Sequence, residues 1–146
     1  MIIGDEDNYF FSKSVSSNYL LDLVIPSINF EMKINDMESE FNDVDYGVEL
    51  LEFSDINNNV YFFASHSGSG DNCYFNRVKE LDIGDNIYIY INNHLLVYEV
   101  VDIYNILKNG YMEVDEYLED VIFLITCHGY NRQLIVKGLL INRINL

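Results

Sequence analysis

From residue 19 onward, the chain alternates between short apolar runs and clusters of turn-forming residues. Runs of about 4–8 residues rich in β-branched and aromatic side chains are typical of strands. Several such runs at close spacing favour a β-sandwich or a barrel. The pattern predicts eight strands, at residues 19–25, 28–33, 47–53, 60–65, 86–91, 95–105, 121–127 and 132–141.

The segments between these runs contain turn signals and two candidate helices. Turns are predicted where Pro, Gly, Asn and Asp gather, at residues 26–27, 55–59, 84–85 and 92–94. Short helices are predicted at residues 74–81 and 114–119, the second with acidic residues suited to a helix N-terminus. Residues 1–18 are polar and predict an N-terminal arm, whereas residues 19–146 predict one domain. The predicted fold class is all-β with one or two short helices.

The charge of the chain narrows the classes of partner. There are 24 Asp and Glu residues against 8 Lys and Arg, which gives a formal net charge of -16. This charge excludes nucleic acid and an anionic membrane surface as direct ligands, because both require a cationic face. It would favour a cationic partner such as an amine, although a generally acidic composition is the simpler explanation. No stretch approaches the roughly 20 apolar residues of a membrane span.

Cys127 is the candidate nucleophile, because it ends an apolar strand just before a predicted hairpin. A four-residue loop of residues 128–131 would set Cys127 opposite Arg132, with Cβ atoms about 4.5–5.5 Å apart. A cation beside a thiol favours the reactive thiolate. His66 follows the predicted strand 60–65 and is the candidate base. The alternative for Cys127 is an inert core position, since free cysteine is often buried.

Other residues of the same types fit the site less well. His128 follows Cys127 directly and should point to the opposite face of its strand. His94 falls in a predicted turn and is interpreted as solvated. Arg77 on a predicted helix and Arg143 in the tail are interpreted as solvated charges. Cys73 lies in a polar loop and is interpreted as a spectator that forms no disulfide.

Five segments match the motifs of one enzyme family, in the same order along the chain. The chain resembles the sortases, the cysteine transpeptidases of Gram-positive surfaces, over nearly its whole length. The matching segments are residues 23–28 (family pattern L-x-I-P-x-I), 64–67 (A-G-H-S), 75–88 (F-x-x-L-x-x-L-x-x-G-D-x-I-Y), 123–127 (T-L-x-T-C) and 132–137 (R-x-I-V).

The resemblance implies an eight-stranded sortase-type β-barrel and a role for each site residue. Cys127 would be the nucleophile, His66 the acid and base, and Arg132 the group that stabilises the oxyanion. Three further residues are expected to bind substrate: Ala64, Ile125 and Thr126. For Ala64 and Ile125, ordinary core packing is an equally good interpretation.

The resemblance also implies a reaction. The enzyme would cleave an LPXTG-like sorting signal after its threonine and form a thioacyl-enzyme. It would then transfer the protein to an amine of a cell-wall precursor or a pilin lysine. The alternatives are a catalytically silent peptide-binding β-barrel and another Cys–His peptidase. A papain-like hydrolase is disfavoured, because there a helix-borne cysteine precedes the histidine.

Cofactor and location are expectations of the same resemblance. No cofactor is required, although some class A sortases bind calcium through carboxylates. The clusters at residues 49–55 and 113–120 suit calcium only loosely, and a solvated acidic face is the better interpretation. Family members act on the extracytoplasmic face of the membrane, held by an N-terminal anchor. This chain is therefore expected to be a soluble fragment of a protein whose gene encodes an apolar segment of roughly 20 residues upstream.

Overall fold

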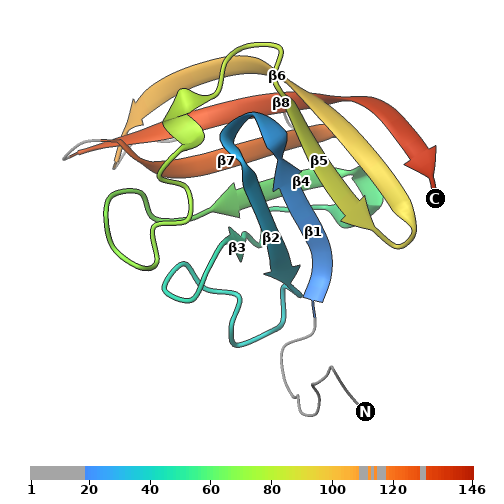
Figure 1. Cartoon of the computed structure of the whole chain (residues 1–146), viewed down its shortest axis with the longest axis horizontal. Helices are drawn as coiled ribbons and strands as arrows, with labels where there is room; N and C mark the ends of the chain where they lie inside the picture. The colour runs from blue at the N-terminus through green and yellow to red at the C-terminus, as the bar shows by residue number, and fades with distance from the viewer. Residues whose placement is uncertain (1–18, 109–111, 113, 115–117, 129–130) are drawn as a thin grey trace.

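The computed structural model describes residues 19–108, 112, 114, 118–128 and 131–146. In this part of the chain, eight strands form one sheet (Figure 1). The strands are β1 (Tyr19–Ile25), β2 (Phe30–Asn35), β3 (Glu49–Leu50), β4 (Val60–Ala64), β5 (Asn86–Ile91), β6 (His94–Leu107), β7 (Val121–His128) and β8 (Arg132–Asn145).

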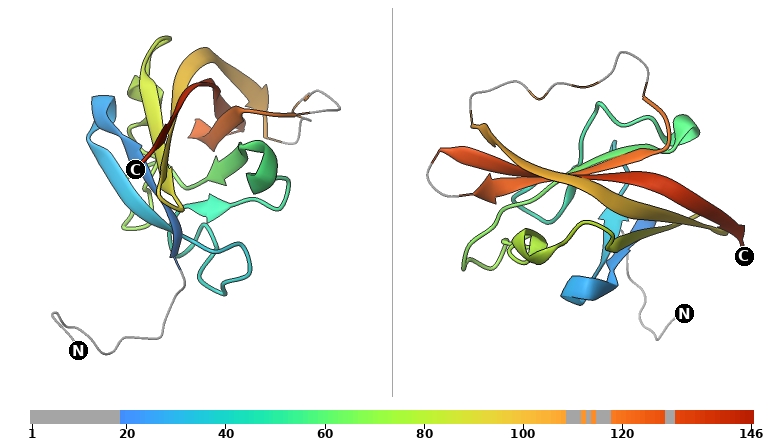
Figure 2. Two further views of the ribbon diagram at one scale, coloured as in Figure 1. Left: turned by 90° about the vertical axis from the view of Figure 1, so that its right-hand side faces the viewer. Right: turned by 90° about the horizontal axis from the view of Figure 1, so that it is seen from above.

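The sheet curls into a nearly closed barrel, which confirms the predicted eight-stranded fold. Its strand order is β2-β1-β5-β6-β8-β7-β4-β3. All neighbouring strands are antiparallel except β4 and β7, which run parallel. Strands β6 and β8, each 14 residues long, form the long twisted ribbon seen from above in Figure 2.

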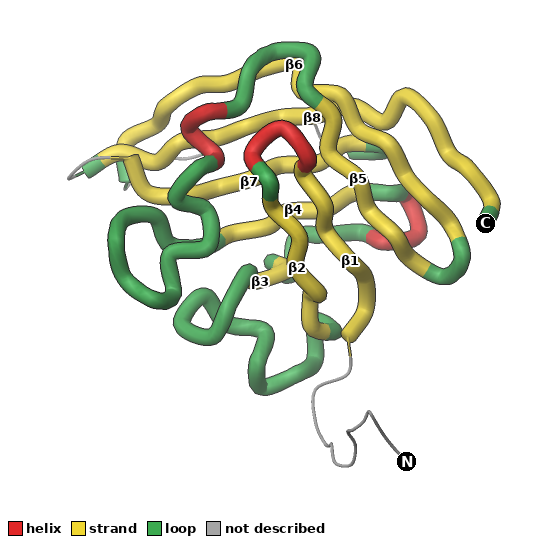
Figure 3. The backbone as a smooth tube through the Cα atoms, viewed as in Figure 1, coloured by secondary structure: helices red, strands yellow, loops and turns green. Residues whose placement is uncertain are grey.

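The prediction of a helix at residues 74–81 is wrong, because only a 3-10 turn, η3 (Val78–Glu80), forms there. Phe75, Val78 and Leu81 are all buried. Their spacing of three residues suits the three-residue repeat of a 3-10 helix better than the α-helical repeat. The other helical pieces in the described residues are also 3-10 turns, η1 (Pro26–Ile28) and η2 (Ile56–Asn58), drawn red in Figure 3. None of the described helices is long and apolar enough to cross a membrane.

The second predicted helix, at residues 114–119, falls mostly outside the described residues. Val114, Leu118 and Glu119 are described, and none of them belongs to a regular element. The predicted N-terminal arm, residues 1–18, also lies outside the described residues.

The predicted strand at residues 47–53 is reduced to the two residues of β3. A side chain takes the place of a neighbouring strand there. The Leu50 amide donates to Asn42 Oδ1 at 2.7 Å, and Asn42 Nδ2 donates to the Leu50 carbonyl at 2.9 Å. Strand β2 starts later than predicted because η1 absorbs Ile28, whereas β6 and β8 extend beyond their predicted ends.

Two apolar layers hold the sheet together. The first fills the barrel with inward-facing residues of most strands, including Leu23, Ile89 and Leu124. The second lies on the opposite face of β4, β7 and β8 and contains Val60, Phe62, Val121, Phe123 and Ile135. Strands β4 and β7 are thus apolar on both faces, as expected of a buried parallel pair.

Gly138 of β8 lies where the barrel leaves no room for a side chain. A Cβ atom added there would lie 2.8 Å from Ile122 Cγ2 and 3.3 Å from the Glu99 carbonyl oxygen. Gly138→Ala is therefore expected to lower the free energy of unfolding by about 1–3 kcal/mol, the usual cost of overpacking. Urea unfolding followed by circular dichroism measures this loss. Gly84→Ala is no suitable control, because Gly84 has a positive φ of 97° and would be strained for another reason.

Two core tyrosines give a matched pair for stability. Tyr98 Oη donates to the Asn59 carbonyl at 2.7 Å, whereas Tyr61 Oη has no partner among the described residues. Tyr98→Phe is expected to cost about 1 kcal/mol of stability at neutral pH, and Tyr61→Phe to be neutral or stabilising. Urea unfolding of both variants checks this. An equal loss in both would mean that the Tyr61 hydroxyl is paired.

Burial also makes the stability depend on alkaline pH. Burial raises the pKa of the Tyr61 phenol to about 12 and raises that of Tyr98 as well. Because the folded pKa lies above the unfolded value, the stabilisation is complete below about pH 10 and is lost as the pH rises towards 12. The free energy of unfolding should therefore fall over this range, and less steeply in Tyr61→Phe.

Candidate active site

The site lies where the parallel strands β4 and β7 end side by side. Their register pairs Ala64 with Ile125. Beyond this pair, the Ser65 amide donates to the Ile125 carbonyl at 3.2 Å, and Thr126 Oγ1 donates to the Ser65 carbonyl at 2.8 Å. Ser67 Oγ then donates to the Cys127 carbonyl at 2.6 Å. Residues 65–67 thus run alongside residues 125–127. When the register of β4 and β7 is continued past its last pair, His66 lies beside Cys127.

Cys127 is a free, partly exposed thiol at the edge of a pocket. The pocket has a volume of about 370 Å³. Besides Cys127 it is lined by Ser67, Gly68, Phe75, Asn76, Lys79, Thr126 and Leu134. The thiol is therefore placed where a ligand can reach it, and the alternative of an inert core cysteine is not supported by its surroundings.

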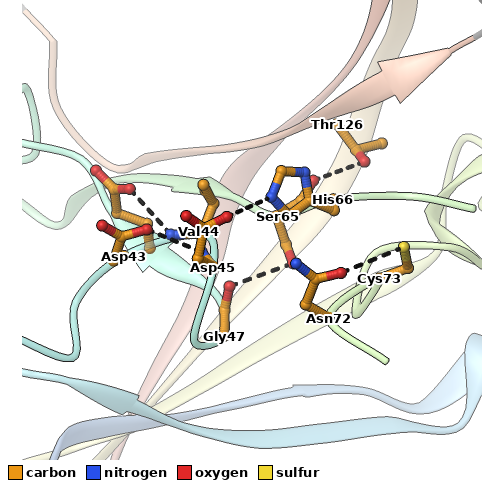
Figure 4. Close-up of polar contacts among 10 residues, drawn as sticks. Asp43, Val44, Asp45, Gly47, Ser65, His66, Asn72, Cys73 and Thr126 are labelled. Atoms are coloured by element: carbon orange, nitrogen blue, oxygen red, sulfur yellow. Dashed lines mark hydrogen bonds and ion pairs between the residues drawn. The ribbon is translucent and has the colours of Figure 1, made fainter. Parts of the chain in front are cut away.

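His66 follows β4 and enters the loop that lines this pocket. Its carbonyl accepts a hydrogen bond from the Phe75 amide at 3.1 Å, which fixes the backbone on that side. Its Nε2 atom lies 3.2 Å from Asp45 Oδ1 (Figure 4). The side chain is 37% exposed, so the imidazole is accessible to solvent and to a substrate.

Arg132 does not lie opposite Cys127, which corrects the predicted hairpin. Strand β7 continues through His128, and the register pairs His128 with Arg132 and Cys127 with Gln133. The loop between the strands thus has three residues, 129–131, instead of four. A shift of one residue moves a side chain to the other face of a sheet. Arg132 therefore shares a face with Leu134, and its catalytic role stays a prediction.

The expected substrate-binding residues fall on two faces of the sheet. Ala64 and Ile125 are register partners, and Ile125 shares the face of Cys127 and packs against the second apolar layer. Both are only partly buried. Thr126 points to the other face, where it is 4% exposed, and its hydroxyl is engaged with Ser65. Thr126 also lines the pocket, and substrate binding by all three residues stays a prediction.

The other cysteine and two other arginines lie outside the pocket that Cys127 lines. Cys73 is a free thiol, as Cys127 is, and its Sγ donates to Asn72 Oδ1 at 3.8 Å; the contact is drawn in Figure 4. Arg77 is more than a solvated charge, because it donates to the Ile28 carbonyl at 2.9 Å and pairs with Glu80 at 3.0 Å. Arg143 lies within β8, not in a tail, and is exposed.

Of the remaining histidines, His94 is not a turn residue as predicted, because it begins β6. Its Nδ1 atom is buried without a partner among the described residues. The register places the backbone of His128 opposite Arg132, one residue away from the thiol position.

The carboxylates considered for calcium do not form a binding site in the part of the chain that the structure describes. No three His, Cys, Asp or Glu side chains gather there. Glu49 Oε1 instead accepts the Val44 amide at 3.2 Å, and Asp55 Oδ2 accepts Asn58 Nδ2 at 2.7 Å. Residues 113 and 115–117 of the second cluster lie outside the described residues.

Two polar contacts of the site were missed by the interpretation of the sequence. Ser67 was noted only as part of a motif, and its bond to the Cys127 carbonyl depends on the parallel pairing of distant strands. Nothing in the sequence distinguishes Asp45 as a partner of His66, because it is one of many acidic residues in the segment between β2 and β3.

Comparison with known sequences gives the family. Residues 23–141 match the family described as "Sortase domain". A curated relative, sortase A of Bacillus anthracis, is 27% identical over 103 residues, which cover 70% of this chain and 49% of that protein. The chain thus spans about half the length of this relative.

Solved structures of sortases share the fold. Sortase A of Listeria monocytogenes has a TM-score of 0.73 at 19% identity, covering 88% of this chain and 90% of that one. Sortase C of Streptococcus pneumoniae has a TM-score of 0.72 at 24% identity, covering 85% of this chain and 69% of that one. The barrel described above is therefore the sortase fold. With the family match over residues 23–141, the chain belongs to the sortase family.

Proposed function

We propose that this chain is the catalytic domain of a cysteine transpeptidase that acts on an LPXTG-like sorting signal. The proposal rests on the hydrogen bonds that connect the residues after β4 with the end of β7. The bonds from Thr126 and Ser67 hold the His66 segment level with an accessible Cys127. A nucleophilic cysteine with a histidine at the same sheet edge is the arrangement that covalent acyl transfer requires.

The reaction begins when the Cys127 sulfur passes its proton to His66 and attacks the carbonyl carbon of the threonine in the signal. Hydrogen-bond donors stabilise the tetrahedral oxyanion, and Arg132 is the candidate side chain for this. The C–N bond then breaks, and His66 gives its proton to the departing amine. A thioacyl-enzyme remains.

The second half-reaction consumes an amine. The acceptor nitrogen attacks the thioester carbonyl, His66 takes the proton that this nitrogen loses, and the C–S bond breaks. A new amide forms, and His66 returns the proton to the Cys127 sulfur, which regenerates the thiol. No cofactor enters either half-reaction, and assays with a chelator and with added Ca²⁺ test that expectation.

The acceptor has two candidates, an amine of a cell-wall precursor and a lysine of a pilin. The relatives include proteins named sortase A and sortase C. The formal charge of -16 favours a cationic amine in either case. Both acceptors lie outside the cell, so we place the working enzyme on the extracytoplasmic face of the membrane.

The test is a screen of LPXTG-like peptides, each incubated with the chain and with two acceptors. One acceptor is a short peptide with an N-terminal amine, and the other is a peptide with a single lysine and a blocked N-terminus. Mass spectrometry detects cleavage after threonine, the thioacyl-enzyme and the transfer product. Absence of a covalent adduct with every peptide, while a thiol-reactive peptide analogue also fails to label Cys127, would leave only a silent peptide binder.

Arg132→Lys tests the oxyanion role. A planar guanidinium offers two parallel donors, which an ammonium cannot reproduce. The variant is therefore expected to lose on the order of 10²-fold in kcat/KM, the scale of one lost oxyanion donor. Arg143→Lys, an exposed arginine of the same strand, is the matched control and should keep wild-type kinetics. A lysine variant at position 132 within a few-fold of wild type would refute the role.

A further inference from the structure

Asp45, in the segment between β2 and β3, reaches the imidazole of His66. Its Oδ1 atom lies 3.2 Å from His66 Nε2, and Figure 4 shows the two side chains turned towards each other. Residue 45 is 21 positions away from residue 66 in sequence. The contact therefore exists only because this segment folds back over the end of β4.

The segment that carries Asp45 is held in place by its own hydrogen bonds. The Asp45 amide donates to Asp43 Oδ1 at 2.8 Å, and the Gly47 amide donates to the Asp43 carbonyl at 3.1 Å. Ser65, the neighbour of His66, donates from Oγ to the Gly47 carbonyl at 3.4 Å. Asp45 thus lies in a turn whose Gly47 carbonyl is bonded to the side chain of Ser65, the neighbour of His66 (Figure 4).

We propose that Asp45 is a positioning residue for His66. A carboxylate that accepts from Nε2–H fixes the tautomer in which Nδ1 is unprotonated and can take or return a proton. The proposal rests on the proposed function, in which His66 moves the proton, and it adds a third side chain that does not itself touch the reacting atoms.

The expected effect is modest because the Asp45 side chain is 73% exposed. Ion pairs at such positions contribute up to about 1 kcal/mol, which corresponds to roughly a fivefold change in rate. Asp45→Asn should therefore lower kcat about fivefold and leave the KM for the sorting peptide unchanged. Asp45→Glu should restore most of the rate. Added salt should reduce the difference between wild type and Asp45→Asn, because exposed pairs are screened.

The tautomer of His66 separates positioning from a structural role. Loss of the carboxylate removes the acceptor of Nε2–H, so the share of the Nε2–H tautomer should fall in Asp45→Asn. Glu40→Gln is the matched control, since it removes one exposed charge from the same segment and should leave both kcat and the tautomer as in wild type.

Nitrogen-15 NMR of the His66 ring measures the tautomer without turnover, because a protonated and an unprotonated ring nitrogen differ in chemical shift. A tautomer ratio and a kcat in Asp45→Asn that match those of wild type would overturn the proposal, and so would a change in KM alone. If the wild type cleaves no peptide but the tautomer ratio changes in Asp45→Asn, the proposed function fails while the contact between Asp45 and His66 stands.

Discussion

Cys127→Ala is expected to abolish both cleavage and transfer, with a loss on the order of 10³-fold or more in kcat/KM. The reason is that each half-reaction passes through a bond to the Cys127 sulfur. The side chain is partly exposed at the edge of a pocket, so its truncation removes no core packing. The loss should therefore appear in mass spectra as an absent thioacyl-enzyme, with the unfolding curve unchanged.

Cys73→Ala is the matched control for this result. Cys73 is the second free thiol of the chain, and its only side-chain hydrogen bond among the described residues is the 3.8 Å contact with Asn72. That variant should form the thioacyl-enzyme at close to the wild-type rate. Peptide cleavage that persists in Cys127→Ala, or that disappears in Cys73→Ala, would place the nucleophile elsewhere.

His66→Ala is expected to lose on the order of 10³-fold in kcat, within the range of a missing general acid and base. The variant lacks the group that protonates the departing amine and deprotonates the acceptor. Its residual rate should no longer show a bell-shaped dependence on pH. Steady-state assays with an LPXTG-like peptide measure both effects. They should run from about pH 5 to about pH 10, a range that includes the usual histidine pKa.

His94→Ala is the control, because His94 begins β6 opposite Ile91 and pairs with Asn145, at the end of β8 away from Gln133, the register partner of Cys127. It should keep the rate and the pH profile of wild type. A His94 variant as impaired as His66→Ala would mean that the loss reflects folding, and a normal pH profile in His66→Ala would mean that another group transfers the proton.

The strands with the clearest alternation were predicted most accurately. Strands β1 and β5 have the predicted bounds, because buried and more exposed residues alternate along them and turn residues follow each strand. The motif around Cys127 was also informative, since two-sided burial of β7 leaves a run of apolar residues that ends at the thiol. These features are local and can be seen in a single sequence.

The errors came from contacts that no local pattern in the sequence reveals. Asn42 takes the place of a strand beside Leu50, which no propensity indicates. The hairpin register depends on whether His128 pairs with Arg132, and a one-residue difference decides the face of Arg132. Asp45 meets His66 only through the fold of the segment before β3. Such contacts are set by tertiary structure, so composition and spacing do not predict them.

The parallel pairing of β4 and β7 also bears on how the protein folds. Val60 pairs with Val121, so the two halves of the site are joined across a long loop that must be closed before the pairing stabilises anything. Contacts of such sequence separation slow folding. The two described strands between them in sequence, β5 and β6, form an antiparallel hairpin that can fold first. Recovery of thiol acylation after dilution from urea should consequently lag behind the recovery of β-sheet circular dichroism.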